Sequence, residues 1–132
     1  MAPEISNDGT PYDGPPVDVF AAGAVLFLMR YAQFAFSSAH DDPFYKMLHK
    51  NPESFLEKRQ LDETDPDFIS LVVGMTEKDP AKRLSLQQVR EHPYLNKEKA
   101  SKEQVKTHFE SIMPEKAKVS KEAYDAMQNQ RL

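Results

Sequence analysis

The stretch VDVFAAGAVLFLMRYAQFAF, residues 17–36, decides how the rest of this 132-residue chain can fold. Its uninterrupted apolar run extends from Val19 to Met29 and is bounded by Asp18 and Arg30. A helix that crosses a bilayer needs about 20 apolar residues, so this run is too short for one. Because the run is apolar around its whole circumference, it predicts a core helix that other elements enclose on all sides.

Start signals for further helices follow this segment. Asp42-Pro43 and Asp65-Pro66 each place an N-cap residue before a proline at the first helical position. The apolar residues behind each start fall on one helical face, and they are Phe44, Met47 and Leu48 in the first helix and Phe68, Ile69, Val72 and Met75 in the second. Residues 51–64, between the two helices, are expected to form a loop or a short turn.

Two capping boxes predict the later helices. Ser85 and Gln88 start one that begins at Leu86 and ends before Pro93. Ser101 and Gln104 start another, whose apolar stripe consists of Val105, Phe109, Ile112 and Met113. A last helix is expected from about Lys121. No window alternates with a period of two, so the predicted fold class is all-α, built around one buried central helix.

Composition and charge exclude several kinds of protein. The chain has no cysteine, which removes disulfides and thiolate metal sites and favours a reducing, cytoplasmic compartment. Residues 1–95 carry 9 Lys and Arg against 15 Asp and Glu, whereas residues 96–132 carry 8 against 6. Neither part has the dense basic stripe that binds a phosphate backbone, so no nucleic-acid partner is expected.

The residues alone predict no catalytic, cofactor-binding or metal site. None of the four glycines is spaced as in a phosphate-binding loop, and none of the serines lies in a nucleophile motif. The four histidines contain no H-x-x-x-H pair, and they are His40, His49, His92 and His108. The neighbouring carboxylates Asp41 and Asp42 are explained by the start of a helix.

Four segments nevertheless resemble one family. MAPE at 1–4, YDGPPVDVFAAGAVLFLM at 12–29, DPFYKML at 42–48 and DPAKRLSLQQVREHPYL at 79–95 are similar, in order and spacing, to the C-terminal half of a eukaryotic protein kinase domain from its A-P-E motif onward. The last segment is more like serine/threonine than tyrosine kinases. The resemblance divides the chain into a partial kinase domain, residues 1–95, and a charged helical tail, residues 96–132.

The resemblance also implies structural roles for individual residues. Glu4 would form a buried ion pair with Arg83, Asp18 would be a buried aspartate at the start of the central helix, and Gly23 would be a structural residue of that helix. The chain departs from the family where Phe20 replaces the usual tryptophan and Ala21 a frequent serine.

The catalytic equipment of the family does not occur in this sequence. It comprises a glycine-rich loop, a strand lysine, a catalytic Asp and Asn, and the Asp of D-F-G. The resemblance therefore implies no autonomous activity, with ATP and magnesium needed only by a full-length parent. We expect a fragment that lacks the N-terminal kinase segment, exposes apolar surface around Asp18 and self-associates.

Three interpretations remain. The first is a fragment of a kinase that phosphorylates protein serine and threonine. The second is a non-catalytic interaction or scaffold module that docks a protein substrate or partner on the helices at 42–50 and 66–75. The third is a helical domain unrelated to kinases. The tail from Asn96 is either a regulatory extension that docks through Val105, Phe109 and Ile112, or a solvated helix.

Overall fold

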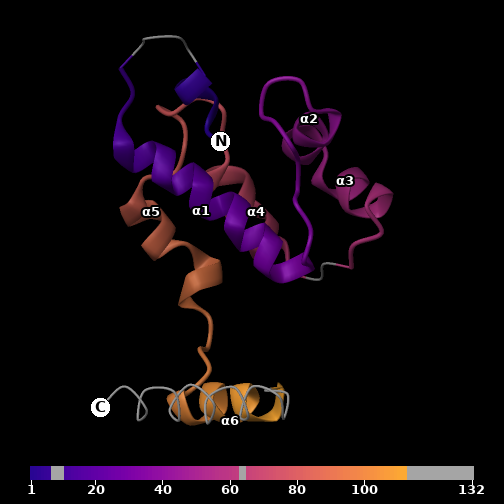
Figure 1. Ribbon diagram of the computed structural model, residues 1–132, viewed down its shortest axis with the longest axis vertical. Coiled ribbons are helices and arrows are strands. Elements are labelled where there is room, and N and C mark those ends of the chain that lie inside the picture. The colour runs from indigo at the N-terminus through magenta and orange to yellow at the C-terminus, as the bar shows by residue number, and fades with distance from the viewer. Residues whose placement is uncertain (7–10, 63–64, 113–132) are drawn as a thin grey trace, which may run out of the picture. The chain divides into compact units, whose positions relative to one another are not determined.

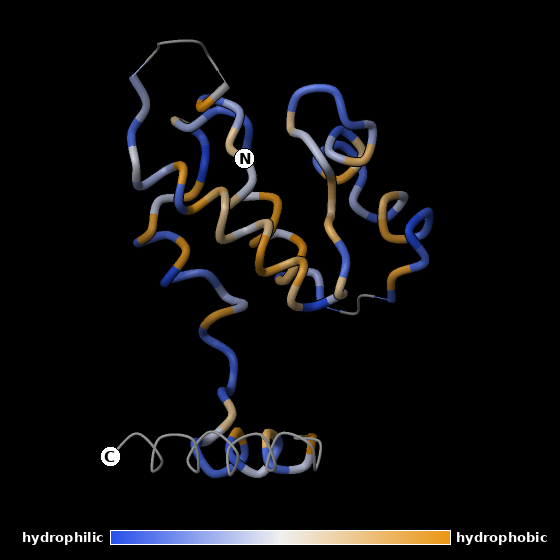
Figure 2. The backbone as a smooth tube through the Cα atoms, viewed as in Figure 1, coloured by the Kyte–Doolittle hydropathy of each residue, from blue (hydrophilic) through white to orange (hydrophobic). Residues whose placement is uncertain are grey.

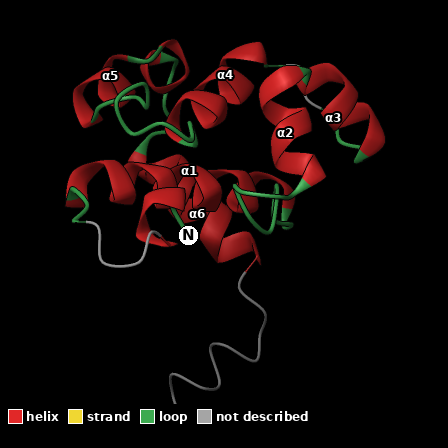
Figure 3. Cartoon of the chain, turned by 90° about the horizontal axis from the view of Figure 1, so that it is seen from above, coloured by secondary structure: helices red, strands yellow, loops and turns green. Residues whose placement is uncertain are grey.

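The computed structural model describes residues 1–6, 11–62 and 65–112. In this part of the chain every regular element is a helix (Figure 3), which confirms the predicted all-α class. In chain order the elements are η1 (Pro3–Ser6), α1 (Gly14–Tyr31), α2 (Pro43–Lys50), α3 (Pro52–Lys58), α4 (Pro66–Met75), α5 (Leu86–Glu91), η2 (Pro93–Asn96) and α6 (Lys102–Ile112).

The chain forms two compact units, Met1–Lys97 and Glu98–Leu132. The first unit, which we call the lobe, contains all elements from η1 to η2, and the second contains α6. The division falls close to residue 95, where the sequence resemblance ends.

The lobe is organised by the packing of α1 against α4 (Figure 1). Both helices are rich in apolar residues along their length (Figure 2). Gly23 of α1 permits their close approach, since a Cβ atom at this position would lie 2.7 Å from the Cβ atom of Met75 and 3.0 Å from Cγ2 of Thr76. The helix pair therefore depends on one residue without a side chain.

Aromatic rings join the α2–α3 pair to this centre. The ring of Phe27 on α1 meets Phe55 on α3 edge to face, with centroids 5.8 Å apart. Phe68 on α4 contacts Tyr31 at 5.9 Å and Tyr94 of η2 at 5.3 Å in the same way. Phe27, Phe55 and Phe68 are fully buried, so these edge contacts form the main core of the lobe.

The predicted helix starts are confirmed. The carboxylate of Asp42 accepts a hydrogen bond from the Phe44 N–H at 2.7 Å, and that of Asp65 accepts one from the Asp67 N–H at 3.1 Å. Both capping boxes are closed in the two directions, and their residues are Ser85 with Gln88 and Ser101 with Gln104. Each start thus satisfies backbone donors that the helix cannot satisfy itself.

The prediction of a loop or short turn over residues 51–64 is wrong, because helix α3 occupies Pro52–Lys58. Asn51 caps this helix by accepting the Ser54 N–H at 3.0 Å, and Pro52 takes the first helical position. The helix carries Phe55 into the core. The start is the same device as at Asp42 and Asp65, with asparagine in place of aspartate.

Two expectations about the central helix also need correction. The helix ends at Tyr31 and not at residue 36, because Ala32 adopts the left-handed conformation with φ 53° and its N–H bonds the Leu28 carbonyl. Moreover, α1 is not enclosed on all sides: Val25 is 52% exposed and Met29 78% exposed. Together with Ala21 and Ala22, which are also exposed, they form what we call the open face of α1.

In the tail, α6 follows its capping box as predicted. The stripe of Val105, Phe109 and Ile112 lies on one side of this helix, and all three residues are exposed. The fourth predicted stripe residue, Met113, and the helix expected from Lys121 lie outside the described residues.

Candidate functional site

The guanidinium of Arg83, in the segment between α4 and α5, forms hydrogen bonds with Glu4 and with three backbone carbonyls. Nη1 and Nη2 donate to the two carboxylate oxygens of Glu4, at 2.6 and 3.0 Å. Nη1 also donates to the Pro16 carbonyl at 2.7 Å, and Nε to the Glu77 carbonyl at 2.9 Å. A further bond from Nη2 to the Lys78 carbonyl, at 3.4 Å, completes the five donors of the group.

The expected ion pair between Glu4 and Arg83 is therefore present, in the bidentate geometry that arginine favours. The Arg83 side chain is fully buried and that of Glu4 is 14% exposed. The hydrogen bond from Arg83 holds the pKa of the Glu4 carboxyl below its usual value. The guanidinium also lies over the ring of Phe20, 5.0 Å from its centroid.

This cluster connects three parts of the chain. Glu4 belongs to η1, Pro16 and Phe20 to the start of α1, and Arg83 to the segment after α4. A buried ion pair holds residues in register, and removing one partner leaves a charge that water cannot reach. The Glu4–Arg83 cluster can position backbone segments, but it offers no acid, base or nucleophile for a reaction.

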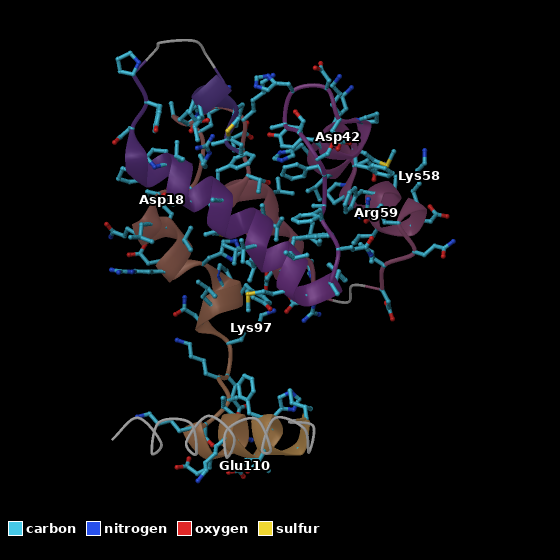
Figure 4. The ribbon with its side chains drawn as sticks, in the orientation of Figure 1. Asp18, Asp42, Lys58, Arg59, Lys97 and Glu110 are labelled. Carbon is cyan, nitrogen blue, oxygen red and sulfur yellow. The ribbon has the colours of Figure 1, made fainter. Side chains whose placement is uncertain are left out.

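Gly23 and Asp18 lie on different sides of α1. Gly23 is buried against α4, as described above. Asp18 is exposed near the start of the helix (Figure 4), which contradicts the burial that the resemblance implied. Among the described residues none forms a hydrogen bond or ion pair with its carboxylate. A carboxylate without such partners is costly to bury and stays in water.

A serine–histidine pair that the sequence did not reveal joins α4 to the start of η2. Oγ of Ser70 lies 3.2 Å from Nε2 of His92. Nδ1 of His92 accepts the Tyr94 N–H at 3.3 Å, so in the neutral ring Nε2 carries the proton and donates it to Ser70. Ser70 in turn donates to the Asp67 carbonyl at 3.1 Å. His92 therefore cannot act as a base toward this serine, and the pair serves packing.

Two further observations bear on the kind of site. Within residues 1–6, 11–62 and 65–112, no group of three or more histidine, aspartate or glutamate side chains could hold a metal ion. No helix in these ranges is both long and apolar enough to span a membrane.

Asp42 serves as a helix cap, and its carboxylate also accepts two hydrogen bonds from Ser37. Burial raises the pKa of this carboxyl, but the hydrogen bonds from Ser37 and Phe44 outweigh burial and hold the pKa below its usual value.

The Glu4–Arg83 cluster holds η1 and the start of α1 against the segment after α4, so its role is structural. Residues 1–95 match the model of the protein kinase domain. The chain therefore belongs to the protein kinase domain family.

The curated relatives carry kinase names. The chain is 30% identical over 112 residues to "Serine/threonine-protein kinase stk11" of Xenopus laevis, covering 85% of this chain and 23% of the relative. It is 36% identical over 100 residues to "SNF1-like protein kinase ssp2" of Schizosaccharomyces pombe, covering 72% and 16%. It is 31% identical over 99 residues to "SNF-related serine/threonine-protein kinase" of Homo sapiens, covering 71% and 12%.

The chain thus spans less than a quarter of the length of these relatives. No solved structure matches it.

Proposed function

We propose that this chain is part of a serine/threonine protein kinase and serves as the helical lobe on which the catalytic segments are assembled. The observation that carries the proposal is the match of residues 1–95 to the protein kinase domain, with relatives named as serine/threonine kinases. The activity would be transfer of a phosphoryl group from Mg-ATP to protein serine or threonine.

We expect the described residues of this chain to form no place for the nucleotide or its metal. The sequence has no closely spaced glycines, and its described acidic and histidine side chains form no metal-binding cluster. The groups that hold ATP and magnesium would come from the segments that precede the A-P-E motif in this family. The lobe would supply rigidity, through the Glu4–Arg83 cluster and the packing at Gly23.

The open face of α1 supports the proposal that other kinase segments bind the nucleotide and pack on this lobe. Val25 and Met29 are large apolar residues of α1, yet each is more than half exposed. Asp18, at the end of the same face, is exposed as well. Surfaces of this kind mark places where another polypeptide packs, and the N-terminal kinase segment is the partner we assign to it.

Isolation of the native protein tests the proposal. An antibody raised to KEKASKEQVKTHFES, residues 97–111, would recover it from its source cells for measurement of mass and of Mg-ATP-dependent phosphorylation of casein. We expect a mass well above the 15.1 kDa of this chain and labelling of serine or threonine. A single species of 15.1 kDa, or a larger species without kinase activity, would contradict it.

The role of the open face needs a matched pair of variants of the native protein. Val25→Lys places a charge on the open face, and Leu86→Lys places one on α5, where the leucine is 56% exposed. We expect Val25→Lys to abolish phosphorylation and Leu86→Lys to leave it unchanged. Equal activity of both variants would show that nothing needed for catalysis packs on α1.

A second candidate is a non-catalytic interaction module. A groove of about 570 Å³ lies between α3 and α4, and its apolar lining consists of Pro52, Leu56, Pro66, Ile69 and Val73. Pockets of about 300–1,000 Å³ hold small ligands, and in this alternative the groove would hold apolar side chains of a partner. If the native species has a mass of 15.1 kDa, we expect a partner to co-purify with it and to be lost from Val73→Arg but retained by Leu86→Lys.

A further inference from the structure

The open face of α1 carries a methionine that is accessible to water. Met29 is 78% exposed, although it is a large apolar residue of a helix at the core of the lobe. It lies one turn beyond Val25, which is 52% exposed, and the helix ends two residues later at Tyr31. Small molecules in solution can therefore reach the thioether of Met29 while the open face is uncovered.

Three other methionines of the described residues have different surroundings. Met75, in the last turn of α4, is 5% exposed and lies against Gly23 on the packed face of α1. Met47 of α2 is half-buried against the main core. Met1 is 77% exposed but does not belong to α1. The lobe thus contains a buried methionine and a half-buried one with which the reactivity of Met29 can be compared.

Exposure decides which of these sulfurs a peroxide can oxidise. With hydrogen peroxide, the thioether sulfur attacks one peroxide oxygen and the O–O bond breaks. That oxygen stays on the sulfur as a sulfoxide, and the other oxygen leaves with both hydrogens as water. The sulfur loses the two electrons that the peroxide gains. An apolar side chain thereby becomes a polar one that contains a hydrogen-bond acceptor.

The position of Met29 gives this change different effects on the two faces of α1. In the lobe alone the sulfoxide stays in water, so the buried side of the helix, with Phe27, is not disturbed. A polypeptide that packs on the open face would have to bury the sulfoxide oxygen. Its neighbours on this face, Val25 and the alanines at 21 and 22, have no side-chain donor. A buried polar group without a hydrogen-bond partner is unfavourable, so oxidation opposes packing.

We propose that Met29 is a site of oxidation by peroxides that controls the open face: the thioether permits another polypeptide to pack on α1, and the sulfoxide prevents it. The inference rests on the proposed function, in which the N-terminal kinase segment packs on this face. A segment that covers Met29 also shields its sulfur, so oxidation acts on molecules in which the face is uncovered. Methionine sulfoxide reductases would reverse the change.

A peroxide time course on the whole 132-residue chain tests the site. After proteolysis, peptide masses give the rate of oxidation of each methionine. We expect Met29 to be oxidised at least about tenfold faster than Met75, since susceptibility follows exposure. A Met29 that reacts as slowly as Met75 would overturn the proposal.

The same samples show whether the lobe tolerates the sulfoxide. Thermal melts would compare the oxidised chain with an equally treated Met29→Leu chain, in which every methionine except Met29 is still oxidised. We expect the same change in melting temperature in both chains. A larger decrease in the unaltered chain would mean that the sulfoxide disturbs the lobe itself, and the proposal would be wrong.

A pair of variants of the native protein tests the effect on packing. Met29→Gln has a polar side chain of similar length, and Met29→Leu keeps an apolar side chain of similar volume. We expect Met29→Gln to phosphorylate casein about tenfold more slowly than Met29→Leu, because only glutamine brings a polar group under the packed segment. Equal activities of the two variants would overturn the proposal.

These results separate the inference from the proposed function. Equal activities in a native kinase larger than 15.1 kDa would overturn the control by Met29 and leave the proposed function standing. A native protein without kinase activity contradicts the proposed function, and the control of packing with it. The peptide masses from the 132-residue chain decide the oxidation site in either case.

Discussion

The two faces of α1 have similar composition and opposite surroundings. On the packed face, Phe20, Gly23 and Phe27 are buried against α4, α3 and the Arg83 guanidinium. On the open face, Val25 and Met29 remain more than half exposed. Hydrophobicity alone therefore does not report which face has a partner. The difference in exposure supports our proposal that another polypeptide packs on the open face.

The largest loss of stability is expected from a substitution on the packed face of α1. Phe27→Ala removes a fully buried ring that contacts Phe55, and we expect a loss of about 3–5 kcal/mol in the free energy of unfolding. Met29→Ala, one half-turn further on the open face, should change it by no more than about 0.5 kcal/mol. Denaturant titration followed by circular dichroism measures both. Similar losses would mean that the two faces do not differ in this chain.

An effect of similar size is expected where Arg83 supports the packed face. Arg83→Ala leaves the partly buried Glu4 carboxylate without its partner and removes the cation over Phe20, and we expect a loss of about 3–5 kcal/mol. The neighbouring Lys82→Ala breaks only an exposed pair with Asp79 at 3.8 Å, so at most about 1 kcal/mol should be lost. The same denaturant titrations apply, and an Arg83→Ala chain as stable as Lys82→Ala would contradict the role of the cluster.

A smaller effect is expected at the contact between α1 and α4. Gly23→Ala introduces a Cβ atom 2.7 Å from the Met75 Cβ, which the helices can accommodate only by moving apart. We expect a loss of about 1–3 kcal/mol. Gly14→Ala, at the first residue of the same helix, meets nothing within 4 Å and should be neutral within about 0.5 kcal/mol. Thermal melts compare the two, and equal melting temperatures would exclude the close approach.

The smallest effect is a change in the pH dependence of stability in acid solution, and it acts through Glu4. The pKa of Glu4 is lower in the folded than in the unfolded chain, so its contribution to stability is complete above the usual value of 4.5 and is lost as pH falls through the folded-state pKa. Glu4→Gln leaves the buried Arg83 charge without its anion and so lowers the stability at every pH. Between about pH 7 and about pH 3, however, its stability should fall less steeply than that of the unaltered chain. Melting temperatures across this range measure the slope, with the exposed Glu53→Gln as control. An unchanged slope in Glu4→Gln would contradict the shift.

Local signals in the sequence predicted much of this fold. A helix start depends on a few consecutive residues, so aspartate before proline and the two capping boxes identified the beginnings of four helices. The start at Asn51 was missed because the segment behind it is polar apart from a few residues, and one of these, Phe55, carries the packing. The Asn51 cap and Pro52 were sufficient to start helix α3 without a longer apolar stripe.

The candidate site was predicted only where a pairwise contact was implied. The Glu4–Arg83 pair followed from the resemblance, but burial of Asp18 and of the whole surface of α1 did not hold in this chain. Burial depends on what else is packed nearby, and a residue pattern does not contain that information. The contacts of Tyr45 and His49 on α2 with Thr76 at the end of α4 depend on helices that meet in space, and no spacing in the sequence marks them.

The Glu4–Arg83 pair also connects residues 79 positions apart. A chain damaged at either end of this interval loses one partner and keeps a charge inside the lobe. Proteases act on the fraction of molecules that are unfolded, so such a chain would be cleared faster in a cell than an intact one. Loss of either partner of this one ion pair would therefore shorten the lifetime of the polypeptide.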